Sequence, residues 1–136
     1  MANYRVTFHP AFQIVECATT GFLTVDELTE ATVATVVLAI EKNTQLILID
    51  DSKLEKAVGT FDIYNLPELY DTLAIDRSIK VSIVLPESPE AKEDVQFYET
   101  VCRNKGWNTE IFEQRQEAID WLRSGPTSKI QGADGS

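Results

Sequence analysis

The sequence is poor in the residues that most catalytic and metal sites need. It has one histidine, His9, and two cysteines, Cys17 and Cys102, which stand far apart. A Ser-His-Asp or Cys-His site would have to use His9, and a zinc site would have to be rich in carboxylates or thiolates. The sequence contains no CxxC or Cys/His spacing that could build one. We therefore expect no catalytic residues, no metal and no cofactor, an exposed turn histidine, and two reduced, mostly buried thiols.

Phosphate-binding loops are also missing from the sequence. There is no GxGxxG and no GxxxxGK[ST] pattern, and the glycines before the C-terminal tail stand alone at positions 21, 59 and 106. The loop at residues 86–90, PESPE, is acidic, which disfavours a phosphate at the helix start behind it. These absences argue against a nucleotide-binding enzyme.

Basic residues and long apolar runs are scarce. Lysine and arginine number 12 against 22 aspartates and glutamates, which gives a formal net charge of −10. Nucleic acid and anionic membranes need clustered positive charge, so neither is an expected partner. The longest aliphatic region, residues 33–40, is too short to span a bilayer, and the first ten residues lack the apolar part of a signal peptide. We expect a cytoplasmic protein without membrane insertion.

The rest of the composition is that of an ordinary folded domain. The chain has 136 residues, of which 43% are hydrophobic and 25% charged, enough for one core. Alternation and helical periodicity predict strands near 4–8, 12–18, 45–50, 80–85 and 107–112, and helices near 25–41, 65–75, 89–105 and 113–123. This order, ββαβαβαβα, predicts a mixed five-stranded sheet with an antiparallel hairpin followed by parallel strands. Residues 1–123 would form this α/β domain, with residues 124–136 as a disordered tail.

Local signals mark several element boundaries. Thr24 and Glu27 fit a capping box at the start of the first helix, and Ser88 precedes a proline at the start of the third. Gly106 is suited to follow the end of that third helix. The aliphatic run at residues 45–50, QLILID, is typical of a central strand that is buried on both faces.

Asp50, Asp51 and Ser52 are the strongest local candidates for a site. They follow the central strand, and open α/β sheets bind ligands at the carboxyl ends of their strands. Two adjacent carboxylates could hold Mg²⁺, or one could accept a phosphoryl group. A phosphoacceptor would need a further hydroxyl and a lysine on neighbouring strand ends, which the sequence does not supply. The interpretation that we favour is that Asp51 or Ser52 caps a turn.

Aromatic residues offer a second candidate site. Their positions fit faces of the expected helices and strands, so core packing is the default interpretation, with a ligand pocket as the alternative. These residues are Phe97, Tyr98, Trp107, Phe112 and Trp121.

The last structured third of the chain resembles a known family. Residues 77–87 (RSIKVSIVLPE), 97–107 (FYETVCRNKGW, a FxExxxxNxG pattern), 111–112 (IF) and 117–122 (EAIDWL) are similar to small bacterial proteins of the SpoIIAA-like, or STAS and CRAL-TRIO, type. The similarity is clearest over residues 77–122. The resemblance implies a STAS-like α/β fold.

The resemblance also implies two kinds of function. STAS proteins of this type are non-enzymatic anti-sigma-factor antagonists, switched by phosphorylation of a serine in an Asp-Ser-Ser-Gly motif. Here that position falls at residues 59–62, GTFD, where Thr60 is the nearby hydroxyl. CRAL-TRIO relatives bind lipids, and this chain could enclose only a smaller apolar cleft.

We therefore expect a non-enzymatic regulatory or protein-interaction module, with a surface around Asp50, Asp51, Ser52 and Thr60. Its partner would be another protein or, by self-association, a second copy in a homodimer. The alternative is a binder of a small apolar or lipid-like ligand in a cleft of the same fold.

Overall fold

The structure is a computed structural model that describes residues 3–56, 76 and 78–124. Within these residues it contains five strands and three helices. They are β1 (Tyr4–His9), β2 (Ile14–Phe22), α1 (Val25–Glu41), β3 (Leu46–Lys56), β4 (Lys80–Val84), α3 (Pro89–Asn104), β5 (Asn108–Phe112) and α4 (Arg115–Arg123). The helix expected near residues 65–75 lies outside the described residues, as does nearly all of the expected tail. No helix in the described ranges has the length and apolar character needed to cross a membrane.

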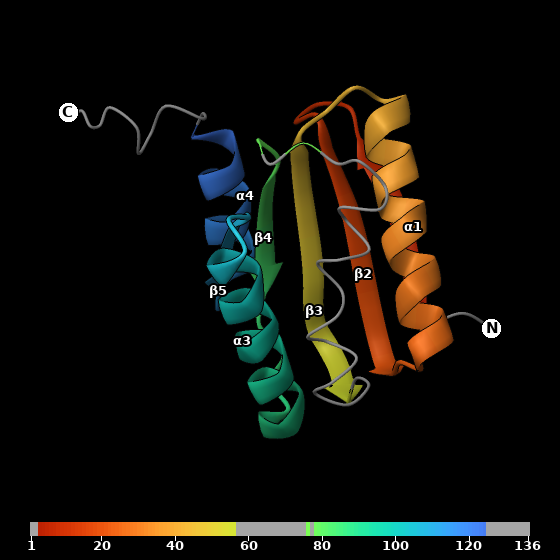
Figure 1. Ribbon diagram of the computed structural model, residues 1–136, viewed down its shortest axis with the longest axis vertical. Coiled ribbons are helices and arrows are strands. Elements are labelled where there is room, and N and C mark those ends of the chain that lie inside the picture. Colours follow the sequence, from red (N-terminus) through yellow and green to blue (C-terminus); the bar gives the residue numbers. More distant parts are fainter. Residues whose placement is uncertain (1–2, 57–75, 77, 125–136) are drawn as a thin grey trace.

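The strands form one mixed sheet in the order β1-β2-β3-β4-β5 (Figure 1). β1 and β2 pair antiparallel, and each later neighbour pairs parallel. The predicted hairpin, the parallel strands and the central place of the aliphatic strand are thus confirmed. Because sequential parallel strands need a crossover on a face of the sheet, helices cover it.

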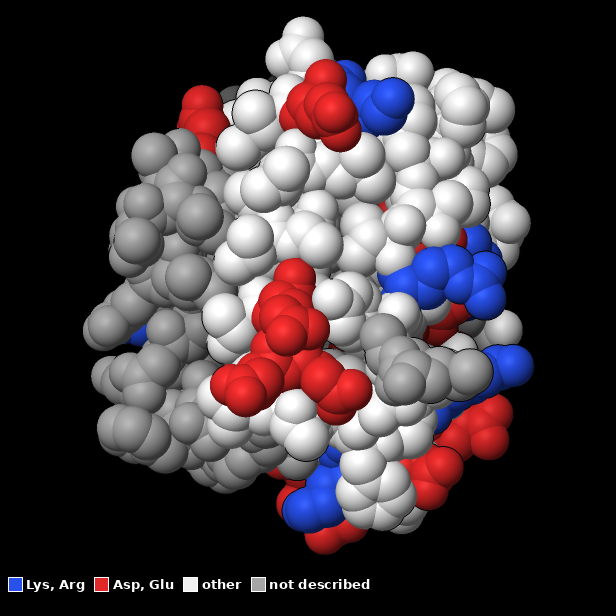
Figure 2. All heavy atoms as spheres, turned by 90° about the vertical axis from the view of Figure 1, so that its right-hand side faces the viewer, with Lys and Arg blue, Asp and Glu red and all other residues white. Residues whose placement is uncertain are grey.

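Each face of the sheet carries its own hydrophobic core. On β3, Ile47 packs in a cluster with residues of α1 and α3, whereas the next residue, Leu48, packs in a second cluster with α4. This alternation follows from the two-residue period of a strand. α1 and α3 therefore lie on one face and α4 on the other, and Figure 2 looks onto the outer side of α1.

The helix boundaries follow from local chemistry. Thr24 and Glu27 form the predicted capping box, in which the Glu27 N–H donates to Thr24 Oγ1 and the Thr24 N–H donates to Glu27 Oε1. The side chain of Ser88 accepts a hydrogen bond from the Ala91 N–H at the start of α3. α3 ends before Gly106, whose φ of 89° is in the left-handed region, as predicted.

The hairpin differs from its prediction at the turn. β1 ends at His9, and β2 begins two residues later than expected, at Ile14, and continues to Phe22. Gln13, with a φ of 58°, makes the reversal. His9 is therefore a strand residue, and its Nε2 lies 2.6 Å from Glu16 Oε1 rather than standing alone in a turn.

The central strand is longer than predicted. β3 continues to Lys56, so Asp50, Asp51 and Ser52 lie within a strand and do not cap a turn. The reason is long-range, since β2 also continues and pairs with β3 up to Lys56. Residues 53–56, which lie beyond the strand predicted at 45–50, therefore also belong to β3.

Candidate functional site

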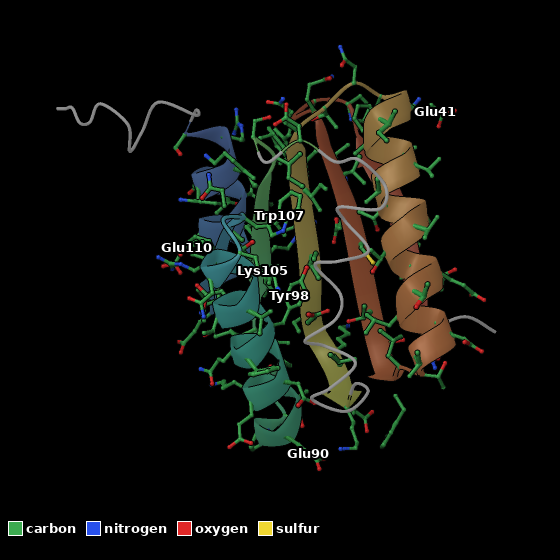
Figure 3. All side chains as sticks on the ribbon, in the orientation of Figure 1. Glu41, Glu90, Tyr98, Lys105, Trp107 and Glu110 are labelled. Atoms are coloured by element: carbon green, nitrogen blue, oxygen red, sulfur yellow. The ribbon has the colours of Figure 1, made fainter. Side chains whose placement is uncertain are left out.

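A mainly apolar cavity of about 110 Å³ lies on the sheet face that α1 and α3 cover. Its described lining comes from α1, β2, β3, β4, α3 and β5, and includes Ile49, Leu54 and Val95. Tyr98 of α3 and Trp107, just before β5, also line it (Figure 3). For comparison, an apolar cavity of about 150 Å³ binds benzene. The volume therefore suits a compact, ring-sized molecule and is too small for a long acyl chain.

Asp51 is the notable polar group of this cavity. Its side chain faces the side of the sheet that α1 and α3 cover, and the residue is only 8% exposed. The hydroxyl of Thr19, on the neighbouring strand, donates to Asp51 Oδ1 over 2.6 Å. The carboxyl group of Asp51 accepts this one hydrogen bond from the residues that the structure describes.

Burial changes the protonation of this carboxyl group. Desolvation raises the pKa of Asp51 from 3.8 to about 6, while the hydrogen bond from Thr19 acts in the opposite direction and the charge of Asp50 adds to the rise. Asp51 thus changes between its neutral and ionised forms around pH 6. A group in this state can donate to a ligand, accept from one, or pair with a cation.

A bulge between β2 and β3 lies at the position of Thr19 and Asp51. Ala18 pairs with Asp50 and Thr20 with Lys53, so β3 holds one extra residue over this interval. The extra residue returns Leu54 to the same face as Asp51, which keeps an apolar residue beside the carboxyl group. The site therefore depends on the register of two parallel strands.

The charged residues in the described lining of the cavity are acidic. Asp51 and Asp94, on α3, line it, and no lysine, arginine or histidine occurs among its described lining residues. A ligand carboxylate or phosphate would meet these two carboxyl groups, and like charges repel. Hydrogen-bond donors and cations fit this lining, and anions do not.

The residues predicted as one surface separate in the structure. Asp50 points to the opposite face from Asp51, because successive strand residues alternate. Asp50 Oδ1 accepts a hydrogen bond from the Ser52 N–H, and both residues line a polar groove of about 350 Å³ with Arg5 and Lys53. Thr60 lies outside the described residues.

The alternation of side chains along β3 also bears on the Mg²⁺ site that was considered for Asp50 and Asp51. Asp50 and Asp51 cannot chelate one cation together, since they lie on different faces. In the part of the chain that the structure describes, no three His, Cys, Asp or Glu side chains gather into a group that could hold a metal.

The opposite face holds an ion-pair network that we call the α4 clamp, formed by His9, Glu16, Asp50 and Arg115. Arg115 Nη1 and Nη2 donate to the two carboxylate oxygens of Glu16, over 2.6 and 2.8 Å, and Nη1 also donates to Asp50 over 2.8 Å. The hydrogen bond from Arg115 holds the pKa of Glu16 below its usual value, against the effect of burial, and His9 adds to the lowering. Because Arg115 belongs to α4 whereas Glu16 and Asp50 belong to β2 and β3, the α4 clamp fastens α4 to the sheet.

Sequence reasoning missed Thr19, Glu16 and Arg115. Thr19 stands one residue beyond the strand predicted at 12–18, so it was not placed beside the aspartates. Glu16 lies inside that strand, where a charged residue between apolar ones was an available signal of a buried pair. Arg115 is 99 residues away from Glu16 and carries no local signal.

Comparison with protein-family models and with curated proteins gives no match. Among solved structures, the chain is similar to an uncharacterised DUF3478-family protein with a SpoIIAA-like fold from Shewanella loihica PV-4. The TM-score is 0.51 at 18% sequence identity, over 88% of this chain and 91% of the other. An identity this low bears on the fold alone. The fold is SpoIIAA-like, as the sequence resemblance predicted, and no activity follows from it.

Proposed function

We propose that this protein is a binding module for a small, compact and largely apolar molecule, held between α1 and α3. The ligand would carry a hydrogen-bond donor or a cationic group directed at Asp51. One observation carries the proposal: a buried carboxyl group with one hydrogen bond among the described residues, from Thr19, faces an apolar cavity.

The energetics of burial support a ligand at this place. A buried carboxyl group costs stability unless hydrogen bonds or an opposite charge compensate it. A ligand ammonium or N–H group beside Asp51 would provide that compensation while its apolar part fills the cavity. Binding would therefore stabilise the folded state by linkage.

The lining narrows the class of ligand. The volume of about 110 Å³ excludes a long lipid chain, and the two acidic side chains disfavour fatty acids and phosphate esters. A ring-sized amine fits both conditions. Benzylamine, toluene and benzoate are suitable probes, since they share one ring and differ in charge.

Titration of the labelled protein with these probes, followed by NMR, tests the proposal. We expect benzylamine to bind more tightly than toluene, and benzoate to bind least, with the largest shifts at cavity residues such as Ile49, Leu54 and Val95. Native mass spectrometry of freshly purified protein would detect a molecule that is already bound.

A matched pair of substitutions on α1 provides the control. Ala31 is buried and lines the cavity, so Ala31→Met should fill it and abolish the shifts. Ala34 is on the same helix and does not line the cavity, so Ala34→Met should bind as the wild type does. Equal binding by both variants, or shifts that map elsewhere, would contradict the proposal.

The regulatory, protein-interaction role that the sequence resemblance implies is a second candidate. The observation that favours it is an exposed apolar stripe on the outer side of α1, away from the cavity.

A further inference from the structure

The outer side of α1 carries large apolar side chains in water. Val37 and Ile40 are 53% and 66% exposed, and Val33 is half-buried. Their spacing of four and three residues places them in one stripe along the helix. Isolated exposed hydrophobic residues are normal on protein surfaces, but a regular stripe is a feature of helices that pack on both sides.

The other two helices provide an internal comparison. The exposed large hydrophobic residues in the described ranges are Phe12, Phe22, Val25, Val37 and Ile40. Three of them belong to α1, and none belongs to α3 or α4, whose outer sides are polar. Among the helices that the structure describes, the exposed apolar character is therefore specific to α1.

Acidic residues continue the same stripe toward the start of α1. Asp26 and Glu30 precede Val33 with the same spacing of four and three residues, and both are exposed. Figure 2 shows the result on this side of the molecule, with an uncharged area above a group of acidic side chains. α1 contains four acidic residues and no lysine or arginine. The stripe is thus acidic over its first half and apolar over its second.

This order argues against a second copy as the occupant. In a parallel pair of α1 helices, Asp26 and Glu30 would face their own copies, and like charges would repel. In an antiparallel pair, these carboxylates would face Val37 and Ile40 of the other copy and lose water without a partner. The formal charge of −10 per chain adds repulsion between copies.

We propose that the stripe formed by Asp26, Glu30, Val33, Val37 and Ile40 docks a helix of another protein that is basic over one half and apolar over the other. Lysine or arginine side chains of the partner would pair with Asp26 and Glu30, and its apolar residues would cover Val37 and Ile40. The stripe is about 20 Å long, the length of four helical turns. It faces away from the cavity, so this inference does not depend on the proposed ligand.

A synthetic amphipathic peptide tests the proposal. The probe is a fluorescent helix-forming peptide of about 18 residues, with leucines at the spacing of the stripe over one half and lysines over the other. One control peptide has glutamate in place of lysine, and a second has the lysine-containing composition in scrambled order. Fluorescence anisotropy measures the affinity of the full chain for each.

We expect the ordered basic peptide to bind and both control peptides to bind at least about tenfold more weakly. The double variant Val37→Asn with Ile40→Gln should weaken binding by about tenfold or more, since it removes the apolar contacts. Both side chains are exposed, so the variant should fold. Asp26→Asn with Glu30→Gln should weaken binding and its salt dependence, whereas Glu117→Gln on α4 should change neither.

Two results would overturn the proposal. Equal binding of the scrambled peptide would show a general attraction to an acidic protein, without a docking surface. Light scattering that finds a dimer, converted to a monomer by the Val37 and Ile40 substitutions, would show instead that a second copy covers the stripe.

Discussion

Adjacent residues of β3 serve different purposes because a strand directs them to opposite faces. Asp50 joins the α4 clamp at the surface, whereas Asp51 lies buried beside Thr19 in the apolar cavity. The sequence indicated that this pair is unusual but not which face each residue takes. That depends on the register between β2 and β3, including the bulge, and no local pattern encodes it.

Replacement of Asp51 by asparagine should stabilise the fold in a pH-dependent way. The folded pKa of about 6 is above the unfolded value near 3.8, so the contribution of Asp51 to stability is full below 3.8 and is lost as pH rises through 6. Asp51→Asn cannot ionise and retains an oxygen that can accept from Thr19. Its free energy of unfolding should exceed that of the wild type by at most about 3 kcal/mol at pH 7.

Urea unfolding at intervals from about pH 4 to about pH 8 measures this difference. The gain should grow between pH 4 and pH 6 and then stay constant. Glu117→Gln, which changes an exposed carboxylate, should show no comparable rise. A difference that does not vary with pH would contradict the assignment of Asp51 as the titrating group.

Lys80 is buried like Glu16 and Asp51, and it has a structural role. It begins β4 and is 3% exposed, and its Nζ donates to the carbonyl oxygen of Trp121 over 2.7 Å near the end of α4. The same Nζ lies 4.5 Å from the ring centre of Trp121. A cation at this position satisfies helix carbonyl groups and interacts favourably with the helix dipole.

Lys80→Met keeps most of the aliphatic packing and removes the ammonium group, so it should destabilise the fold by about 1–3 kcal/mol. Lys53→Met, at an exposed position, should change stability by less than about 0.5 kcal/mol. Thermal unfolding followed by tryptophan fluorescence measures both. Equal melting temperatures for the two variants would show that the contact contributes nothing.

At the scale of elements, local signals located the helices better than the strands. Thr24 with Glu27 and Ser88 act on their own first turns, so the starts of α1 and α3 could be predicted to the residue. β3 was predicted too short, because residues 53–56 are strand only through pairing with the continued β2. The attachment of α4 to the sheet could not be predicted, since Glu16 and Arg115 meet only in the folded chain.

The α4 clamp should contribute measurably to stability. Arg115→Gln leaves the largely buried Glu16 without its main partner and should cost about 1–3 kcal/mol at pH 7, a figure reduced from that of a fully buried pair because the Arg115 side chain is 43% exposed. The lowered pKa of Glu16 means that this contribution is present above 4.5 and is lost as pH falls through the lower folded value.

Denaturant unfolding at neutral and acid pH checks this expectation. Arg103→Gln is the matched control, because Arg103 pairs with Glu99 and Glu110 at an exposed position on α3. The control should cost less than about 1 kcal/mol. If the two variants lose the same stability, or if the loss for Arg115→Gln is unchanged in acid, the clamp is not a stabilising feature.

At the scale of the whole molecule, the order of elements was enough to predict the sheet. Sequential βαβ units with ordinary connections allow few topologies, so the mixed sheet followed from the order of the elements. The SpoIIAA-like fold was predicted separately, from the resemblance of residues 77–122 to that family. The cavity could not be predicted, because its described lining residues come from six elements whose spacing depends on how all of them pack. The exposed apolar stripe on α1 could not be predicted either, because helical periodicity alone does not distinguish a side that faces the core from a side that faces water.

A crystal structure determined after soaking with benzylamine tests the central claim most directly. We predict electron density for the ring between α1 and α3, with the ammonium nitrogen about 3 Å from the Asp51 carboxylate. A crystal of Ala31→Met treated in the same way should lack this density. Density for the ring at another place, or a cavity that contains only water in the wild type, would contradict the account.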